Sequence, residues 1–352
     1  MLQQEFWNIL FFGLLSSFVV YNVHFGAGTV HAVHRGGSSR DSSIARLLPM
    51  PGKQSLLISS GAGPVAVLLA TALLEEGHAV TLLDYASSGV STDKLYSSLQ
   101  SSSTSSSSSS TGSSSVAGRL QFASCDMQNT QQLADVLDSG QPDAVVLLAG
   151  SAAGESEPKL AFLDSTSSRV LSLLSAIGNS TVSKLLVSSS LAVYGQHSNT
   201  PVSEDSTCCK PASMQGHTAQ LVEAAVQAYA AATPSLSAAI LRHGFVFGAP
   251  SSAGLGTASG AALGAARNPP TVYIVGSGRA YSQRDVWKAC HKLFGGGPQA
   301  NEELPSDEAC QGITADTSKF TAHTGWRAKL QLEDALIHAL QRQQGTAAQA
   351  QH

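Results

Sequence analysis

The period of apolar and polar positions changes repeatedly along the chain from Ser55 onwards. Residues 55–59 (SLLIS) form a short apolar run, apolar positions then recur with a helical period from Pro64, and residues 78–84 (HAVTLLD) form a second run that ends on Asp84. Apolar runs return at 119–126, 143–150 and 184–190, with helical segments between them, the longest at 159–177. Buried runs that alternate with helices are typical of parallel strands covered on both faces. The pattern predicts an α/β fold with a Rossmann-type, doubly wound parallel sheet.

The N-terminal region has a different pattern. Residues 1–5 form a short tail, and residues 6–23 are an uncharged apolar run close to the ~20 residues that a membrane-spanning helix needs. Residues 24–50 are a stalk rich in Gly, Ser and His. We expect a single-pass membrane anchor or signal-anchor and a Golgi or other endomembrane location. The orientation stays open, because the arginines after the run favour a cytosolic domain and an Asn179 sequon favours a lumenal one.

A low-complexity tract interrupts the alternating pattern. Residues 97–115 are nearly all serine and offer little apolar surface to offset the entropy of ordering. We expect a disordered surface loop there.

Composition excludes some classes of function. The chain has 352 residues, 43% hydrophobic and 12% charged, which is typical of a globular protein. Its formal net charge is -4 and it has no basic block, so nucleic acid is not an expected partner. The five cysteines are scattered without a C-x-x-C motif, which predicts free thiols and no metal site.

The first strand and helix enclose a small-residue motif. Gly61, Gly63 and Ala66 fit G-x-G-x-x-A, in which small residues let the backbone approach a pyrophosphate at a helix N-terminus. Asp84 ends the following strand, where a carboxylate can accept hydrogen bonds from an adenosine ribose. No arginine follows Asp84, which favours NAD over NADP. The alternative is a tight turn without a ligand.

Five segments together resemble a known family. They are GAGPVAVLLATALLEEGHAVTLLD, DAVVLLAGSAAGES, LLVSSSLAVYG, LRHGFVFGA and ITADTSKFTAHTGWRAKLQLEDAL. In this order they resemble the extended short-chain dehydrogenases/reductases of the NAD-dependent epimerase/dehydratase family, in particular UDP-glucose (UDP-galactose) and UDP-arabinose 4-epimerases. The resemblance implies an NAD-binding Rossmann domain at 51–249, a truncated sugar-nucleotide domain at 250–345 and a tail at 346–352. A UDP-sugar is the implied substrate, and a homodimer is compatible with the resemblance.

The resemblance also assigns roles to single residues. By the match, Asp84 holds the adenosine ribose, Asp126 lies by the adenine, and Ala149 and Gly150 line the cofactor cleft. Ser190 is then the hydroxyl that faces the substrate. The three glycine positions of the family's nucleotide turn are Ser60, Gly63 and Ala66 here, and the serine is expected to weaken NAD binding.

The proton-transfer residues depart from the family pattern. The resemblance implies a tyrosine and, four residues later, a lysine, at the positions of Gln215 and Ala219. Glutamine has no titratable proton and alanine carries no charge. His217 is a candidate substitute, but two residues along a helix turn it about 200° away. Two hypotheses therefore remain: an epimerase homologue with impaired catalysis, and an active UDP-sugar 4-epimerase that uses a substitute base.

The predicted substrate-binding region is also shorter than in the family that the chain resembles. Where the family carries a long substrate-contacting segment, residues 250–271 read as a short Ala/Gly/Ser linker. No arginine stands near Leu304 to Asp307, where the family has one. A diphosphate would lack a bidentate partner at that point.

Overall fold

The computed structural model describes residues 52–59, 64–84, 119–148, 159–195, 201–206, 210–244, 254–279, 281, 285, 288–289, 292, 313–328 and 332–333. The predicted anchor at 6–23 and the serine tract at 97–115 lie outside these residues. Among the described helices, none combines the length and apolar character that crossing a membrane requires.

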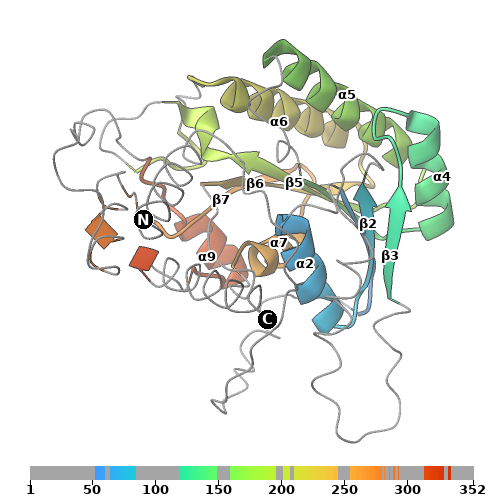
Figure 1. The fold of residues 1–352 in the computed structure, drawn as a ribbon, viewed down its shortest axis with the longest axis horizontal. Coiled ribbons are helices and arrows are strands. Elements are labelled where there is room, and N and C mark those ends of the chain that lie inside the picture. The colour runs from blue at the N-terminus through green and yellow to red at the C-terminus, as the bar shows by residue number, and fades with distance from the viewer. Residues whose placement is uncertain are drawn as a thin grey trace, which may run out of the picture.

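The described residues form a seven-stranded parallel sheet in the order β3-β2-β1-β4-β5-β6-β7 (Figure 1). The strands are β1 (Ser55–Ser59), β2 (Ala79–Asp84), β3 (Leu120–Ser124), β4 (Ala144–Leu148), β5 (Lys184–Ser190), β6 (Ser237–His243) and β7 (Thr271–Val275). The direction of winding reverses between β1 and β4, which is the switch point of a doubly wound sheet. The predicted fold class is confirmed.

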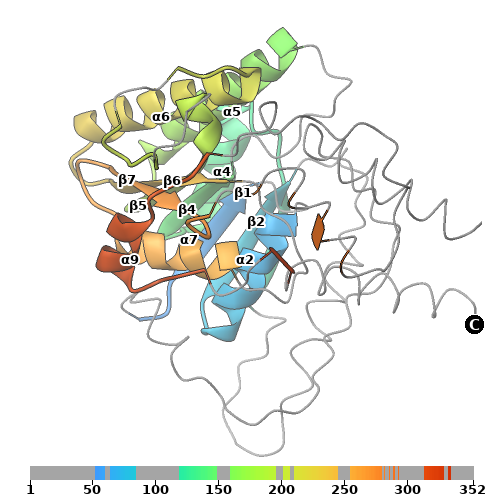
Figure 2. The same ribbon diagram turned by 90° about the vertical axis from the view of Figure 1, so that its left-hand side faces the viewer.

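Helices cover both faces of the sheet (Figure 2). One face packs against α2 (Pro64–Glu75), α7 (Gly254–Gly264) and α9 (Ser318–Thr324), and the other against α4 (Thr130–Gly140), α5 (Lys159–Ile177) and α6 (Met214–Ala232). We call these the α2/α7 face and the α5/α6 face. Each strand of the central sheet contributes alternate side chains to the two cores, for example Leu186 to the first and Val187 to the second.

Local sequence signals set the helix boundaries. Asn129 caps α4 by accepting hydrogen bonds from the amides of Gln131 and Gln132, and Gln141 ends this helix in the left-handed conformation. Ser213 caps α6 in the same way as Asn129 caps α4, because its hydroxyl accepts a hydrogen bond from the amide of Gly216. The stretch after β5 therefore begins a long helix, as the sequence predicts.

The prediction of a short linker at 250–271 is wrong, because these residues contain the helix α7. Alanine has the highest helix propensity, and the small side chains let this helix pack closely on α2. Ala258, Ala261 and Ala262 are fully or almost fully buried in the shared core. After α7 the chain adds β7 to the edge of the same sheet. The division into domains at residue 250 stays a prediction.

Candidate functional site

The carboxyl ends of the parallel strands form the edge at which ligands bind in doubly wound sheets. At the switch point, the buried Ser59 hydroxyl accepts a hydrogen bond from the Leu148 amide, with 2.8 Å between the Oγ and N atoms. The backbone pairing between β1 and β4 covers only residues 56–58 of β1. At Ser59, the next residue, the side chain makes the hydrogen bond to β4 instead of the backbone. This bond thus joins the carboxyl ends of β1 and β4 at the switch point.

The predicted cofactor residues that the structure describes lie at this edge or beneath it. α2 begins at Pro64, so its positive N-terminus follows the turn after β1. Ala66 is fully buried in the core beneath α2. β2 ends at Asp84, and Asp126 follows the neighbouring β3, so both acids lie at the carboxyl edge. These residues fit a dinucleotide, whose pyrophosphate suits a helix N-terminus and whose ribose suits an acid after β2.

The remaining predicted cofactor residues precede α2 or follow β4 in the chain. Ser60, Gly61, Gly63, Ala149 and Gly150 lie outside the described residues. The Asp126 carboxylate accepts a hydrogen bond from the Gln128 amide at 2.9 Å, so it also stabilises the turn that leads to α4.

The start of α6 has an unreactive surface. Gln215 is exposed, and Ala219 is half-buried against the apolar cluster of Leu191, Val193, Tyr194, Val202, Ile274 and Ala315. His217 is exposed, as expected for a solvated histidine. None of these three side chains has a partner that would prepare it for proton transfer among the described contacts.

Gly216 lets the first turn of α6 approach its neighbours closely. A Cβ atom at this position would overlap the carbonyl oxygen of Ala192 and contact Pro211. The helix therefore packs closely on the short helix η3 (Leu191–Tyr194) because this residue has no side chain.

Ser190 ends β5 and is half-buried. Its hydroxyl accepts a hydrogen bond from the Ala192 amide at 3.1 Å and so caps η3. The predicted substrate-facing hydroxyl is present at the carboxyl edge, and it also holds the turn into η3.

A buried ionic network that the sequence analysis missed lies on the α5/α6 face. The Arg242 guanidinium donates to both carboxylate oxygens of Glu223, with a shortest distance of 2.6 Å between Nη2 and Oε2. Arg242 also donates to the Tyr194 hydroxyl at 2.7 Å, and Ser189 donates to Glu223. Glu223 is 4% exposed and Arg242 is 7% exposed. Burial opposes the charge of Arg242, but the hydrogen bonds and charge of Glu223 outweigh burial and raise its pKa.

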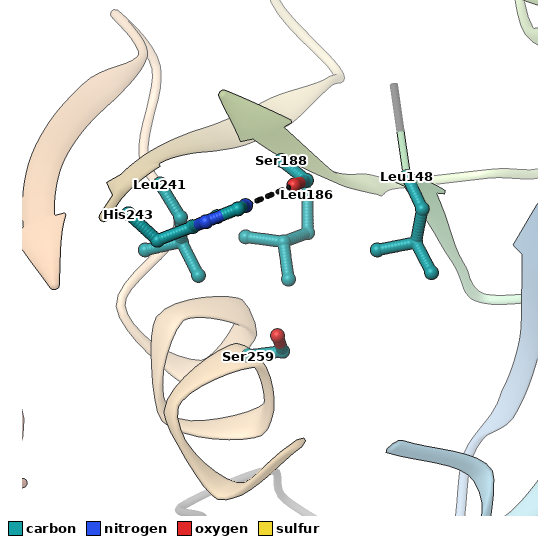
Figure 3. Close-up of a pocket in the computed structure, with 6 residues that line it drawn as sticks. All are labelled: Leu148, Leu186, Ser188, Leu241, His243 and Ser259. Atoms are coloured by element: carbon teal, nitrogen blue, oxygen red, sulfur yellow. Dashed lines mark hydrogen bonds between the residues drawn. The ribbon is translucent and has the colours of Figure 1, made fainter. Parts of the chain in front are cut away.

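A second missed pair lies on the α2/α7 face, in a pocket shown in Figure 3. The Ser188 hydroxyl and His243 Nε2 are 2.7 Å apart, and His243 Nδ1 is 2.9 Å from the Gly244 carbonyl oxygen. Burial lowers the pKa of His243, and the hydrogen bond to Gly244 opposes this only in part. The other residues that line the pocket are Leu148, Leu186, Leu241 and Ser259.

The sequence carries a weak signal for both pairs. The runs KLLVSSS and SAAILRH are apolar strands that turn polar over their last residues. Polar residues at the carboxyl end of a buried strand are candidates for a site in a parallel sheet. Which of them meet depends on the order and register of β5 and β6, which the local pattern of the two runs does not show.

A metal site has no support in the described ranges, which hold no group of three or more His, Cys, Asp or Glu side chains that could bind an ion.

Comparison with known families gives a match over most of the chain. The model of the NAD dependent epimerase/dehydratase family matches residues 56–291. UDP-glucose 4-epimerase 3 of Oryza sativa subsp. japonica is 28% identical over 207 residues, which cover 57% of this chain and 52% of that protein. UDP-glucose 4-epimerase of Corynebacterium glutamicum is 30% identical over 197 residues, which cover 55% of this chain and 52% of that protein. The matched region thus spans about half the length of these curated relatives.

Solved structures share the fold. A UDP-glucose-4-epimerase from Stenotrophomonas maltophila, with bound NAD and formylated UDP-arabinopyranose, superposes with a TM-score of 0.65 at 20% identity and covers 84% of this chain and 99% of that chain. A UDP-glucose 4-epimerase from Bifidobacterium longum, in complex with NAD+ and UDP, gives a TM-score of 0.63 at 20% identity, with 83% and 99% coverage.

Proposed function

The chain belongs to the NAD-dependent epimerase/dehydratase family, and we propose that it binds NAD and a UDP-sugar but is impaired as a 4-epimerase. The observation that carries this proposal is the start of α6, where Gln215 is exposed and Ala219 is half-buried, at the positions that the resemblance assigns to the proton-transfer pair. The rest of the expected framework supports binding, since the sheet edge, the helix N-terminus, the acid that ends β2 and the acid that follows β3 are present.

NAD is the proposed cofactor. It supplies a hydride acceptor when bound, while the chain provides the α2 N-terminus for the pyrophosphate and Asp84 for the ribose. We expect calorimetric titration to show tighter binding of NAD than of NADP. Asp84→Ala should weaken NAD binding, because two ribose hydroxyls lose their acceptor. Equal or tighter binding of NADP by the wild type would reject this assignment.

A UDP-sugar is the proposed second ligand. This proposal follows the names of the related epimerases and the described complexes of other family members with UDP or a UDP-sugar. Titration of UDP against the NAD-saturated protein measures the affinity directly. No detectable binding of UDP under these conditions would reject a UDP-sugar as the second ligand.

Impaired turnover is the catalytic part of the proposal. Loss of a positioned general base typically lowers a rate by about 10²- to 10⁴-fold. We therefore expect interconversion of UDP-glucose with UDP-galactose, and of UDP-xylose with UDP-arabinose, to be at least about 10²-fold slower than in an active relative. The Corynebacterium glutamicum enzyme, assayed in parallel, is a suitable positive control. Turnover equal to that of the control would show that the chain is a fully active epimerase.

The second hypothesis, an active epimerase with a substitute base, now has a specific observation in its favour. The exposed His217 does not provide it. The observation is instead the hydrogen-bonded pair of Ser188 and His243 at the same edge of the sheet.

A further inference from the structure

Hydrogen bonding fixes the proton positions of the His243 ring. The Gly244 carbonyl oxygen can only accept, so Nδ1 must carry the proton that it donates across 2.9 Å. In a neutral ring, Nε2 is then an acceptor, and the Ser188 hydroxyl donates to it across 2.7 Å. The arrangement is a hydroxyl, a base that accepts its proton and a third group that orients the base.

The surroundings keep this base neutral. Burial of the His243 ring lowers its pKa below the ordinary value of 6.5. Leucine side chains from β4, β5 and β6 line the pocket around the pair. At neutral pH, His243 Nε2 is therefore available to take a proton instead of already holding one.

The pair also lies where chemistry is expected in this fold. His243 is the last residue of β6 and Ser188 is two residues from the end of β5, and both point to the α2/α7 face (Figure 3). Leu148, which ends β4 at the switch point, lines the same pocket. α2, whose N-terminus fits a pyrophosphate, packs on this face of the sheet.

The other candidate groups are less suited to proton transfer. His217 is exposed on α6 and has no described partner that orients its ring. The Ser190 hydroxyl accepts a hydrogen bond from the Ala192 amide and has no described base beside it.

We propose that Ser188 and His243 are the proton-transfer unit of this chain and carry its residual reaction with a sugar hydroxyl. This inference rests on the proposed binding of NAD and a UDP-sugar. In the oxidation step, the substrate C–H bond gives its hydride to NAD+ and the hydroxyl oxygen forms the ketone. The hydroxyl proton passes to Ser188 Oγ as the Ser188 proton passes to His243 Nε2. The products are a keto sugar, NADH and a histidinium. The reverse step restores the sugar hydroxyl, NAD+ and the neutral His243 ring.

The first test needs neither ligand. Nitrogen-15 NMR of the histidine-labelled protein, with His243→Gln used to assign the signal, reports the tautomer and the charge of the ring. We expect a neutral ring with the proton on Nδ1 at neutral pH. A proton on Nε2 at that pH, whether in the other tautomer or in a histidinium, overturns the proposal, because Nε2 could not accept another.

The second test measures the reaction. Wild type saturated with NAD and UDP-glucose should form NADH slowly, and His243→Gln and Ser188→Ala should each lower that rate by about 10²-fold or more. Ser188→Thr keeps the hydroxyl and should retain most of the rate. His217→Gln is the matched control and should leave the rate unchanged. The wild-type rate should also fall as His243 becomes protonated at acidic pH.

Ligand titrations separate the two ways of failing. If the wild type does not bind NAD, the proposed function is wrong and this inference fails with it. If NAD and UDP-glucose bind but no NADH forms, or if NADH forms at the same rate in His243→Gln, only the proton-transfer proposal is overturned. Thermal unfolding of each variant shows whether a lost rate reflects a lost fold.

Discussion

Strands β5 and β6 carry two polar pairs on opposite faces of the sheet, built from consecutive residues. Ser189 and Arg242 point to the α5/α6 face and meet Glu223, whereas Ser188 and His243 point to the α2/α7 face and meet each other. A shift of one residue along a strand moves a side chain to the other face. The two pairs therefore come from neighbouring positions of the same two strands but lie in different surroundings.

The two pairs differ in charge and in whether a side-chain atom remains that can accept a proton. Glu223 and Arg242 are buried as ions, and each oxygen or nitrogen of the network already has a partner from Ser189, Tyr194 or the opposite ion. The hydrogen bonds of this network thus join its own members to one another. Ser188 and His243 form a neutral pair whose ring nitrogen can still gain a proton. Burial with full pairing thus indicates a structural role, and burial that keeps a neutral base indicates a chemical one.

The largest expected effect comes from breaking the ionic network. Arg242→Leu leaves the Glu223 carboxylate buried without its counter-ion, which typically costs about 3–5 kcal/mol of unfolding free energy. Urea denaturation measures the change. The double variant Arg242→Leu with Glu223→Leu should recover part of the loss, because no isolated charge remains. A loss below about 1 kcal/mol in Arg242→Leu would mean that the pair is solvated.

A somewhat smaller effect is expected where α6, the helix that carries Glu223, meets η3. Gly216→Ala places a methyl group against the Ala192 carbonyl oxygen, and overpacking of this kind costs about 1–3 kcal/mol. Gly276→Ala is the matched control, since a Cβ atom there meets nothing within 4 Å. Thermal unfolding should separate the two variants clearly. Equal melting temperatures would show that α6 can move away from η3 at little cost.

The neutral pair should contribute less to stability than the ionic network. Ser188→Ala removes one hydrogen bond to a half-buried ring, so we expect a loss of about 0.5–1.5 kcal/mol in urea denaturation. Ser188→Thr should lose less, since the hydroxyl remains. If Ser188→Ala destabilised the fold as strongly as Arg242→Leu, the pair would be a structural element like the network on the other face.

The smallest effect is a dependence of stability on pH. The folded pKa of His243 lies below its unfolded value, so the unfolded chain binds the proton more tightly. The stability that the neutral ring provides is present above pH 6.5 and is lost as the pH falls from there towards the folded pKa. We expect His243→Gln to reduce this slope. His78 also has a pKa lowered by burial and by Arg119, so the slope should not vanish. An unchanged slope would mean that His243 titrates alike in both states.

Sequence reasoning succeeded where one local pattern was sufficient. The runs at 55–59 and 184–190 became β1 and β5, and the segment at 159–177 became α5 with the same ends. It failed at 250–271, because alanine, glycine and serine have little contrast between apolar and polar positions. That segment became α7 only through its packing on α2.

The sequence by itself determined that buried parallel strands alternate with helices, that Asp84 ends the second strand and that no titratable group stands at Gln215 or Ala219. These features depend on residue type and on periods of a few residues. Only the tertiary structure decided that Ser188 meets His243, 55 residues later in the chain, and that Arg242 meets Glu223 instead of a ligand. The physical reason is that the register between β5 and β6 and the packing of α6 select one partner for each side chain, and both arise from contacts distant in sequence.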